Sequence, residues 1–116
     1  MTIYLAADHA GFDLKERVKI YLQTMNYEIE DFGALELNPE DDYPDFIFPA
    51  MKALAIALKN VKDSRGIIFG SSGQGEAMIA NRFPAIRAVV CDDNSDLTAK
   101  VKVWREHNNS NVLSLG

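Results

Sequence analysis

Short apolar runs alternate with helix-like segments along the whole of this 116-residue chain. The segments between the runs place apolar residues at helical spacing. Strands that alternate with helices predict a parallel sheet covered on both faces and joined by right-handed crossovers. We therefore expect a Rossmann-like three-layer α/β sandwich around a five-stranded parallel sheet. The expected strands are 3–7, 27–32, 66–69, 86–91 and 112–115.

The composition fits one domain, residues 1–116, with a core of its own. The net charge of −5 argues against a nucleic-acid partner, because phosphate backbones attract basic surfaces. The one cysteine, Cys91, allows no internal disulfide and is expected in the core, which favours a reducing compartment. The chain start does not resemble a signal peptide, and no apolar run reaches the length of a membrane span. We expect a cytoplasmic protein.

A glycine-rich loop, 70–75, links the expected strand 66–69 to a helix that opens with Glu76. Ligands of open α/β sheets bind at such corners, where backbone N–H groups favour an anion or oxyanion. Phosphate binding alone explains the glycines but not the carboxylate, whereas a base acting on a substrate held by the loop explains both. The helix start is expected to keep Glu76 ionised. The alternative is a glutamate that merely complements the helix dipole, worth about 0.3–1 kcal/mol.

The same loop excludes two common nucleotide-binding motifs. It lacks the lysine of a Walker A loop, and it follows the third strand, whereas a dinucleotide-binding loop follows the first. Its serines, Ser71 and Ser72, have two open interpretations: plain loop and cap residues, or hydroxyls that steady a developing enediolate.

Two other polar groups are candidates for function. Asp8 and His9 end the first strand and should meet the loop at the carboxyl ends of the strands. The segment 107–109 enters the last strand and should lie at the opposite end of the sheet. It is either unrelated to the site or reaches the site of a neighbouring subunit.

Several other residues have structural interpretations. Trp104 is expected in the core or at an interface, and the acidic pairs 41–42 and 92–93 are expected to be solvated loop residues. Asn94 or Ser95 is expected to cap the helix that follows, through residue 106. No spacing of His, Cys and Asp fits a known ligand set, so we expect no metal.

Four separated motifs give the chain a resemblance to a known family. They are Asp8-His9-Ala10-Gly11, Asp42-Tyr43-Pro44, the loop from Gly70 to Glu76 with the following Ala80-Asn81-Arg82, and Arg105-Glu106-His107-Asn108-Asn109. Together they make the chain resemble ribose-5-phosphate isomerase B and the galactose-6-phosphate isomerase subunits. The resemblance implies an aldose–ketose isomerase of carbohydrate metabolism that works through a cis-enediolate, without a metal or other cofactor.

The resemblance also implies a role for individual residues. The family has two versions: one uses a cysteine base at the start of the loop, here Gly70, and the other a glutamate at its end, here Glu76. Glu76 is thus the implied base, with Ser72 holding the enediolate and His107 opening the sugar ring. The implied substrate-binding residues are Asp8, His9, Ser71, Gly73, Gln74, Gly75 and Asn108, with His9 at the phosphate end.

The resemblance implies a homodimer with shared sites, because His107 and Asn108 come from the partner subunit in the family. A tetramer stays open, as does the choice between pentose and hexose phosphates, with ribose 5-phosphate and ribulose 5-phosphate favoured. Family members continue into a C-terminal helix and phosphate-binding arginines, which this sequence lacks, and neither Arg82 nor Arg87 obviously substitutes. A second hypothesis is therefore a non-catalytic or partner-dependent sugar-phosphate-binding subunit. A third is a general anion-binding module.

Overall fold

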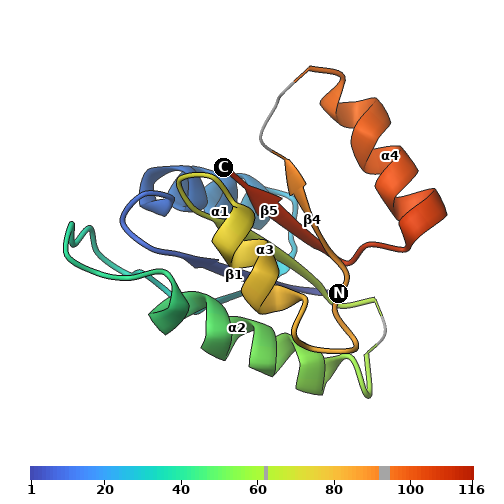
Figure 1. Ribbon diagram of the computed structural model, residues 1–116, viewed down its shortest axis with the longest axis horizontal. Coiled ribbons are helices and arrows are strands. Elements are labelled where there is room, and N and C mark those ends of the chain that lie inside the picture. Colours follow the sequence, from blue (N-terminus) through green and yellow to red (C-terminus); the bar gives the residue numbers. More distant parts are fainter. Residues whose placement is uncertain (62, 92–94) are drawn as a thin grey trace.

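The computed structural model describes residues 1–61, 63–91 and 95–116. The five described strands are all parallel, in the order β2-β1-β3-β5-β4, and helices cover both faces of the sheet (Figure 1). The predicted sandwich is confirmed, and each predicted strand boundary lies within two residues of the observed one. The elements are β1 (Thr2–Ala7), α1 (Phe12–Thr24), β2 (Glu28–Asp31), α2 (Pro44–Ala57), β3 (Arg65–Phe69), α3 (Gln74–Ala80), β4 (Ala88–Cys91), α4 (Leu97–Asn108) and β5 (Val112–Leu115).

The two faces of the sheet carry separate apolar cores. On one face, α2 buries Ile47, Ala50, Met51 and Leu54, which recur at helical spacing, and α3 packs beside it. On the other face, α1 packs Leu22 into the cluster around Phe69. The strands are therefore covered on both sides, as their apolar sequences require.

Helix α4 lies on the α1 side of the sheet but stands away from it (Figure 1). None of its 12 residues is buried. A cavity of about 220 Å³ separates it from the strands, with Trp104 on the helix side and Ile67 and Leu113 on the sheet side. Trp104 is half-buried here, so the helix contacts the sheet through a few partly exposed side chains.

A buried ion pair ties α1 to the end of β2. Lys15 is wholly buried, and its Nζ lies 2.7 Å from Asp31 Oδ2 and 2.7 Å from Glu16 Oε2. The other oxygen of Asp31 accepts a hydrogen bond from the Gly33 N–H at 2.8 Å, and the Gly33 carbonyl accepts one from the Ala7 N–H at 2.7 Å. The Lys15–Asp31 pair therefore supports the turn that lies against the carboxyl end of β1.

The strand order puts the switch point of the sheet between β1 and β3, and the region where the segments after these two strands meet is called the crevice below. From β1 the chain passes to β2 on one side, and β3 then pairs with β1 on the other. Connections diverge at such a switch point, and ligands bind beyond the strand ends there. The segment after β1 packs directly against the end of β3 at Gly11, because a Cβ at this position would lie 2.5 Å from the Phe69 carbonyl carbon. The segments after β1 and β3 consequently face one another.

The cap prediction for α4 was wrong at Ser95. The helix begins at Leu97 after Asp96, which has a left-handed backbone (φ 52°) and makes no side-chain capping bond. The expected cap Asn94 and the acidic pair 92–93 lie outside the described residues. Cys91 is buried at the end of β4, as predicted. No helix in the described ranges is both long and apolar enough to cross a membrane.

Candidate active site

The loop after β3 is fixed by the last strand. Gly73 has a positive φ of 78°, a conformation that glycine adopts without steric cost, and it precedes the first residue of α3. Its carbonyl accepts a hydrogen bond at 2.7 Å from the buried Oγ of Ser114 in β5. A Cβ on Gly116 would overlap the Ser72 backbone, so the end of β5 also lies against the loop. The end of β5 therefore contacts the loop at both Gly73 and Ser72.

The carboxylate of Glu76 turns back toward the end of β3. The residue is 4% exposed and lies in the first turn of α3. A Cβ on Gly70 would overlap this carboxylate, with Oε1 at 2.7 Å and the other carboxylate atoms closer. The Glu76 side chain thus occupies the space that a side chain at position 70 would need.

Burial raises the pKa of Glu76 above its ordinary value, and the negative charge of Asp8 adds to the rise. Hydrogen bonds from the backbone at Glu76 and Gly73 act in the opposite direction but do not cancel it. Removal of the carboxylate from water thus opposes the stabilisation of the ionised form that the helix start was expected to give, and that Glu76 is ionised at neutral pH stays a prediction. A carboxyl with a pKa nearer neutrality is a better proton acceptor and donor at physiological pH.

Asp8 and His9 come directly after β1 and lie at the same crevice. Asp8 is buried, its Oδ1 accepts a hydrogen bond from the Ala10 N–H at 3.0 Å, and its charge acts on both Glu76 and His9. His9 is partly exposed. The hydrogen bond with Asp41 is the main cause that raises the pKa of His9; burial lowers it, and the charge of Asp8 raises it further.

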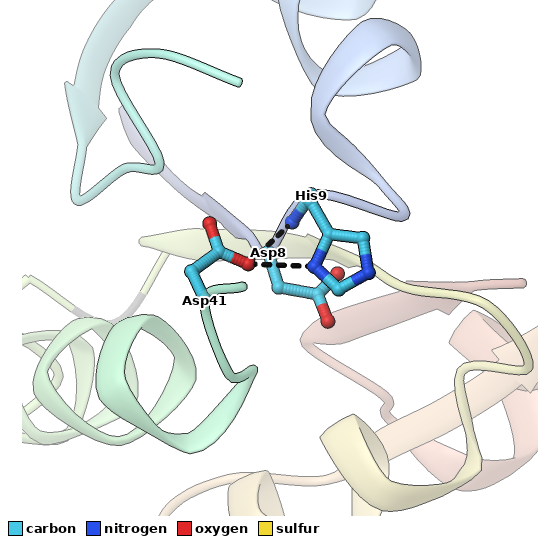
Figure 2. A group of neighbouring side chains, drawn as sticks. All are labelled: Asp8, His9 and Asp41. Atoms are coloured by element: carbon cyan, nitrogen blue, oxygen red, sulfur yellow. Dashed lines mark hydrogen bonds and ion pairs between the residues drawn. The ribbon is translucent and has the colours of Figure 1, made fainter. Parts of the chain in front are cut away.

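Asp41 is a site residue that the sequence analysis missed. It was expected to be solvated, but its side chain is only 8% exposed, whereas Asp42 is exposed as predicted. One oxygen, Oδ1, accepts hydrogen bonds from both the backbone N–H and Nδ1 of His9, each at 2.8 Å (Figure 2). The other oxygen, Oδ2, is buried without a described partner. The loop between β2 and α2 brings Asp41 to His9, and no local sequence pattern predicts the course of this loop.

Asp8, His9 and Asp41 also offer three ligand atoms within 4.8 Å of one another. Nδ1 of His9 and Oδ1 of Asp41 already share a hydrogen bond, so a cation would have to displace the proton between them. The geometry is that of a carboxylate–imidazole pair, and the prediction that no metal is required stays a prediction.

Tyr43, from the motif Asp42-Tyr43-Pro44, packs against the loop 70–75 at Gly75. Tyr43 is half-buried, and a Cβ on Gly75 would lie 2.6 Å from its hydroxyl oxygen. A glycine at position 75 is therefore required for the tyrosine to approach the loop this closely. The sequence indicated Tyr43 only as part of a motif, without a contact.

Residues 3–116 match the sequence model of a family described as Ribose/Galactose Isomerase. The chain belongs to this ribose/galactose isomerase family. It is 40% identical over 118 residues to ribose-5-phosphate isomerase B of Mycobacterium tuberculosis, covering 100% of this chain and 67% of that protein. It is 33% identical over 116 residues to a 4-deoxy-4-sulfo-D-erythrose isomerase of a Clostridium species, covering 100% of this chain and 68% of that protein.

Solved structures agree with the family assignment. Ribose-5-phosphate isomerase B of Mycoplasma genitalium, crystallised with bound ribulose-5-phosphate, superposes with a TM-score of 0.87 at 29% identity, over 99% of this chain and 71% of that one. The Clostridium thermocellum ribose-5-phosphate isomerase B has a TM-score of 0.83 at 35% identity, over 100% of this chain and 72% of that one. The fold of this isomerase family is therefore shared along the whole described chain.

The loop serines of this family member are exposed. Ser72 Oγ accepts a hydrogen bond from the Gln74 N–H at 3.2 Å, which is a local loop contact. Ser71 and Gln74 are also exposed, and Gly75 is half-buried. These positions border the crevice, and their roles toward a substrate stay predictions.

His107 and Asn108 lie at the other end of the sheet from Glu76. Both are exposed at the end of α4, just before β5 starts beside the amino ends of β3 and β4. Arg87 is at that end too, where its Nε donates to the Asn109 carbonyl at 2.7 Å. The structure thus brings together Asp8, His9, the loop and Glu76, and leaves His107 and Asn108 remote from them within one chain.

Proposed function

We propose that this protein is an aldose–ketose isomerase that interconverts ribose 5-phosphate and ribulose 5-phosphate, with Glu76 as the base. The relatives named ribose-5-phosphate isomerase B and the neighbour with bound ribulose-5-phosphate support the reaction and the substrate class. The observation that carries the choice of base is the Glu76 carboxylate, buried at the β1–β3 crevice with a raised pKa.

The reaction needs one group that both removes and returns a proton. Glu76 takes the proton from C2 of the open-chain aldose, and the electron pair of that C–H bond forms the C1–C2 double bond of a cis-enediolate. The carbonyl oxygen O1 gains the negative charge. Glu76 then returns the proton to C1, while the hydroxyl proton of O2 passes to O1 and O2 becomes the ketone oxygen. A carboxyl with a raised pKa suits both transfers.

The loop supplies the groups that face the developing charge. The amides of Gly73, Gln74 and Gly75, with the hydroxyls of Ser71 and Ser72, are proposed to hold the enediolate oxygens. Fixed donors aimed at a developing oxyanion are a large term in such reactions. The bond from Ser114 to the Gly73 carbonyl supports this role, because it holds the loop in place.

The space beside Gly70 supports Glu76 over another base. In the family version that the resemblance describes, a cysteine at this position is the base. Here the Glu76 carboxylate fills the space in which that side chain would begin. A glutamate from α3 and a cysteine from the end of β3 would thus present their reactive atoms to the same region.

Ring opening needs groups that a single chain does not bring to the crevice. His107 is proposed to move the ring-opening proton and Asn108 to orient the sugar. Their location at the opposite end of the sheet supports a homodimer with shared sites. Within one chain, Asp8 is proposed to bind a substrate hydroxyl or the ring oxygen, and His9 the phosphate.

A coupled assay with ribose 5-phosphate tests the base. Glu76→Gln keeps the size of the side chain and should lower kcat by about 10²–10⁴-fold, the usual contribution of a general base. Glu30→Gln on exposed β2 is the matched control and should keep kcat. Wild-type turnover in Glu76→Gln would rule out this base. Absence of turnover in both variants and the wild type would instead favour the partner-dependent subunit.

A further inference from the structure

One carboxylate oxygen holds two N–H groups of the same histidine. Oδ1 of Asp41 accepts from the backbone N–H of His9 and from its Nδ1, both at 2.8 Å (Figure 2). The two bonds close a ring that includes the His9 backbone and imidazole. The orientation of the imidazole is therefore set by a residue 32 positions along the chain.

The burial of Asp41 restricts rotation of the His9 imidazole. The Asp41 side chain is 92% buried, since its exposed fraction is 8%, and a buried acceptor that has lost its donor is costly. An ionised carboxylate only accepts, so the proton in the bond belongs to Nδ1. Figure 2 shows the other ring nitrogen, Nε2, on the side away from Asp41.

This arrangement determines what Nε2 can do. In a neutral imidazole with its proton on Nδ1, Nε2 has only a lone pair and cannot donate to an anion. In the protonated imidazole, Nε2–H is a charged donor. Among the described residues, the charged groups that act on His9 are Asp41 and Asp8, and both favour the protonated form.

We propose that Asp41 is a positioning residue that holds His9 as a protonated donor, with Nε2–H directed at the anionic end group of the substrate. The proposal rests on the isomerase function proposed above. It adds a residue outside the substrate-contacting set: Asp41 acts through His9 and sets the pH range over which the anion is held.

Nuclear magnetic resonance titration of the imidazoles tests the proposal without turnover. The chain has two histidines, so the signals of His9 are readily separated from those of His107. Asp41→Asn keeps an acceptor oxygen but removes the charge, and should lower the pKa of His9. The neighbouring exposed Asp42→Asn is the matched control and should leave it unchanged. An unchanged His9 titration in Asp41→Asn would overturn the proposal.

A second measurement uses the wild-type protein alone, so it does not depend on the variant folding. Above its pKa, neutral His9 should carry its proton on Nδ1, as read from its two ¹⁵N shifts. Addition of inorganic phosphate below that pKa should shift the Nε2 signal. The opposite tautomer, or no response of Nε2 to phosphate, contradicts the proposal even if the protein proves to be an active isomerase.

Steady-state kinetics separates positioning from a general structural role. At a pH between the His9 titration midpoints measured in the two proteins, Asp41→Asn should raise KM for ribose 5-phosphate by about tenfold, because His9 donates a charged hydrogen bond in the wild type and is neutral in the variant. At a pH below both midpoints the difference in KM should narrow, because His9 is then protonated in both proteins. A KM increase that is the same at both pH values would indicate a structural role and refute the positioning role.

Discussion

Adding one methyl group to Gly70 should disable the proposed base while leaving the sheet intact. A Cβ at this position lies 2.7 Å from Glu76 Oε1, and the other carboxylate atoms are closer, whereas ordinary van der Waals contact begins at 3.4 Å. The backbone directly after β3 is fixed by a hydrogen bond from the Gly70 N–H to the Leu115 carbonyl at 3.0 Å. In Gly70→Ala the carboxylate must therefore move by about 1 Å.

The size of the effect follows from that displacement. A catalytic group misplaced by about 1 Å costs on the order of 10²-fold in rate. If the buried carboxylate cannot move far enough, the overpacked site also loses about 1–3 kcal/mol of folding stability. We expect kcat to fall by about 10²-fold and KM to change little, because the loop amides and His9 are not displaced.

The coupled assay with ribose 5-phosphate, together with thermal unfolding, measures both effects. Gly66→Ala, within β3, is the matched control for Gly70→Ala, which changes the residue directly after that strand. Its added Cβ meets only side-chain ends, the nearest being Leu54 Cδ2 at 3.1 Å. It should lower stability slightly and preserve kcat. A Gly70→Ala protein that is folded and turns over at the wild-type rate would refute the argument that Glu76 acts from this position.

Turnover should rise with pH as Glu76 ionises, because the base works only in its ionised form. A kcat–pH profile measures the midpoint of this rise. A midpoint at the ordinary pKa of glutamate would contradict the argument that burial raises the pKa of Glu76. A pKa raised on folding means that wild-type stability falls as pH rises through the folded-state value. Glu76→Gln should therefore melt above wild type at neutral pH, with the advantage disappearing in acid. Lys15→Met should lower the urea-derived unfolding free energy by about 3 kcal/mol, near the low end for a broken buried pair, because Lys19 still contacts Asp31 at 2.9 Å. The partly exposed Lys19→Met should cost about 1 kcal/mol or less, so equal losses would argue against burial as the cause.

The parts of the site that sequence predicted are those set by local chain chemistry. Alternating strand and helix patterns place Asp8 after β1 and Glu76 after β3, and the parallel topology then brings both to one crevice. The glycines of the loop and the first-turn position of Glu76 are visible in a few consecutive residues. Such features require no knowledge of how distant segments pack.

The parts that sequence missed depend on tertiary burial. Lys15 has the sequence context of a surface charge on a helix, yet it is wholly buried. Its ion pair with Asp31 makes this burial possible. The rise in the pKa of Glu76 was not predicted, because it comes from burial of the carboxylate by the folded chain. The partner of His9 was missed because Asp41 arrives by the path of a loop without periodic structure.

Helix α4 carries His107 and Asn108, yet it buries none of its 12 residues. A helix of this length is marginal in water on its own, and most helical stability in proteins comes from packing. Its amides should therefore exchange with solvent through local opening long before those of the central strands. The two residues proposed to complete the site are thus carried by a helix that buries none of its side chains within one chain. A partner that docks on α4 would supply its ordering free energy, so folding of this helix and completion of the site would be a single thermodynamic event.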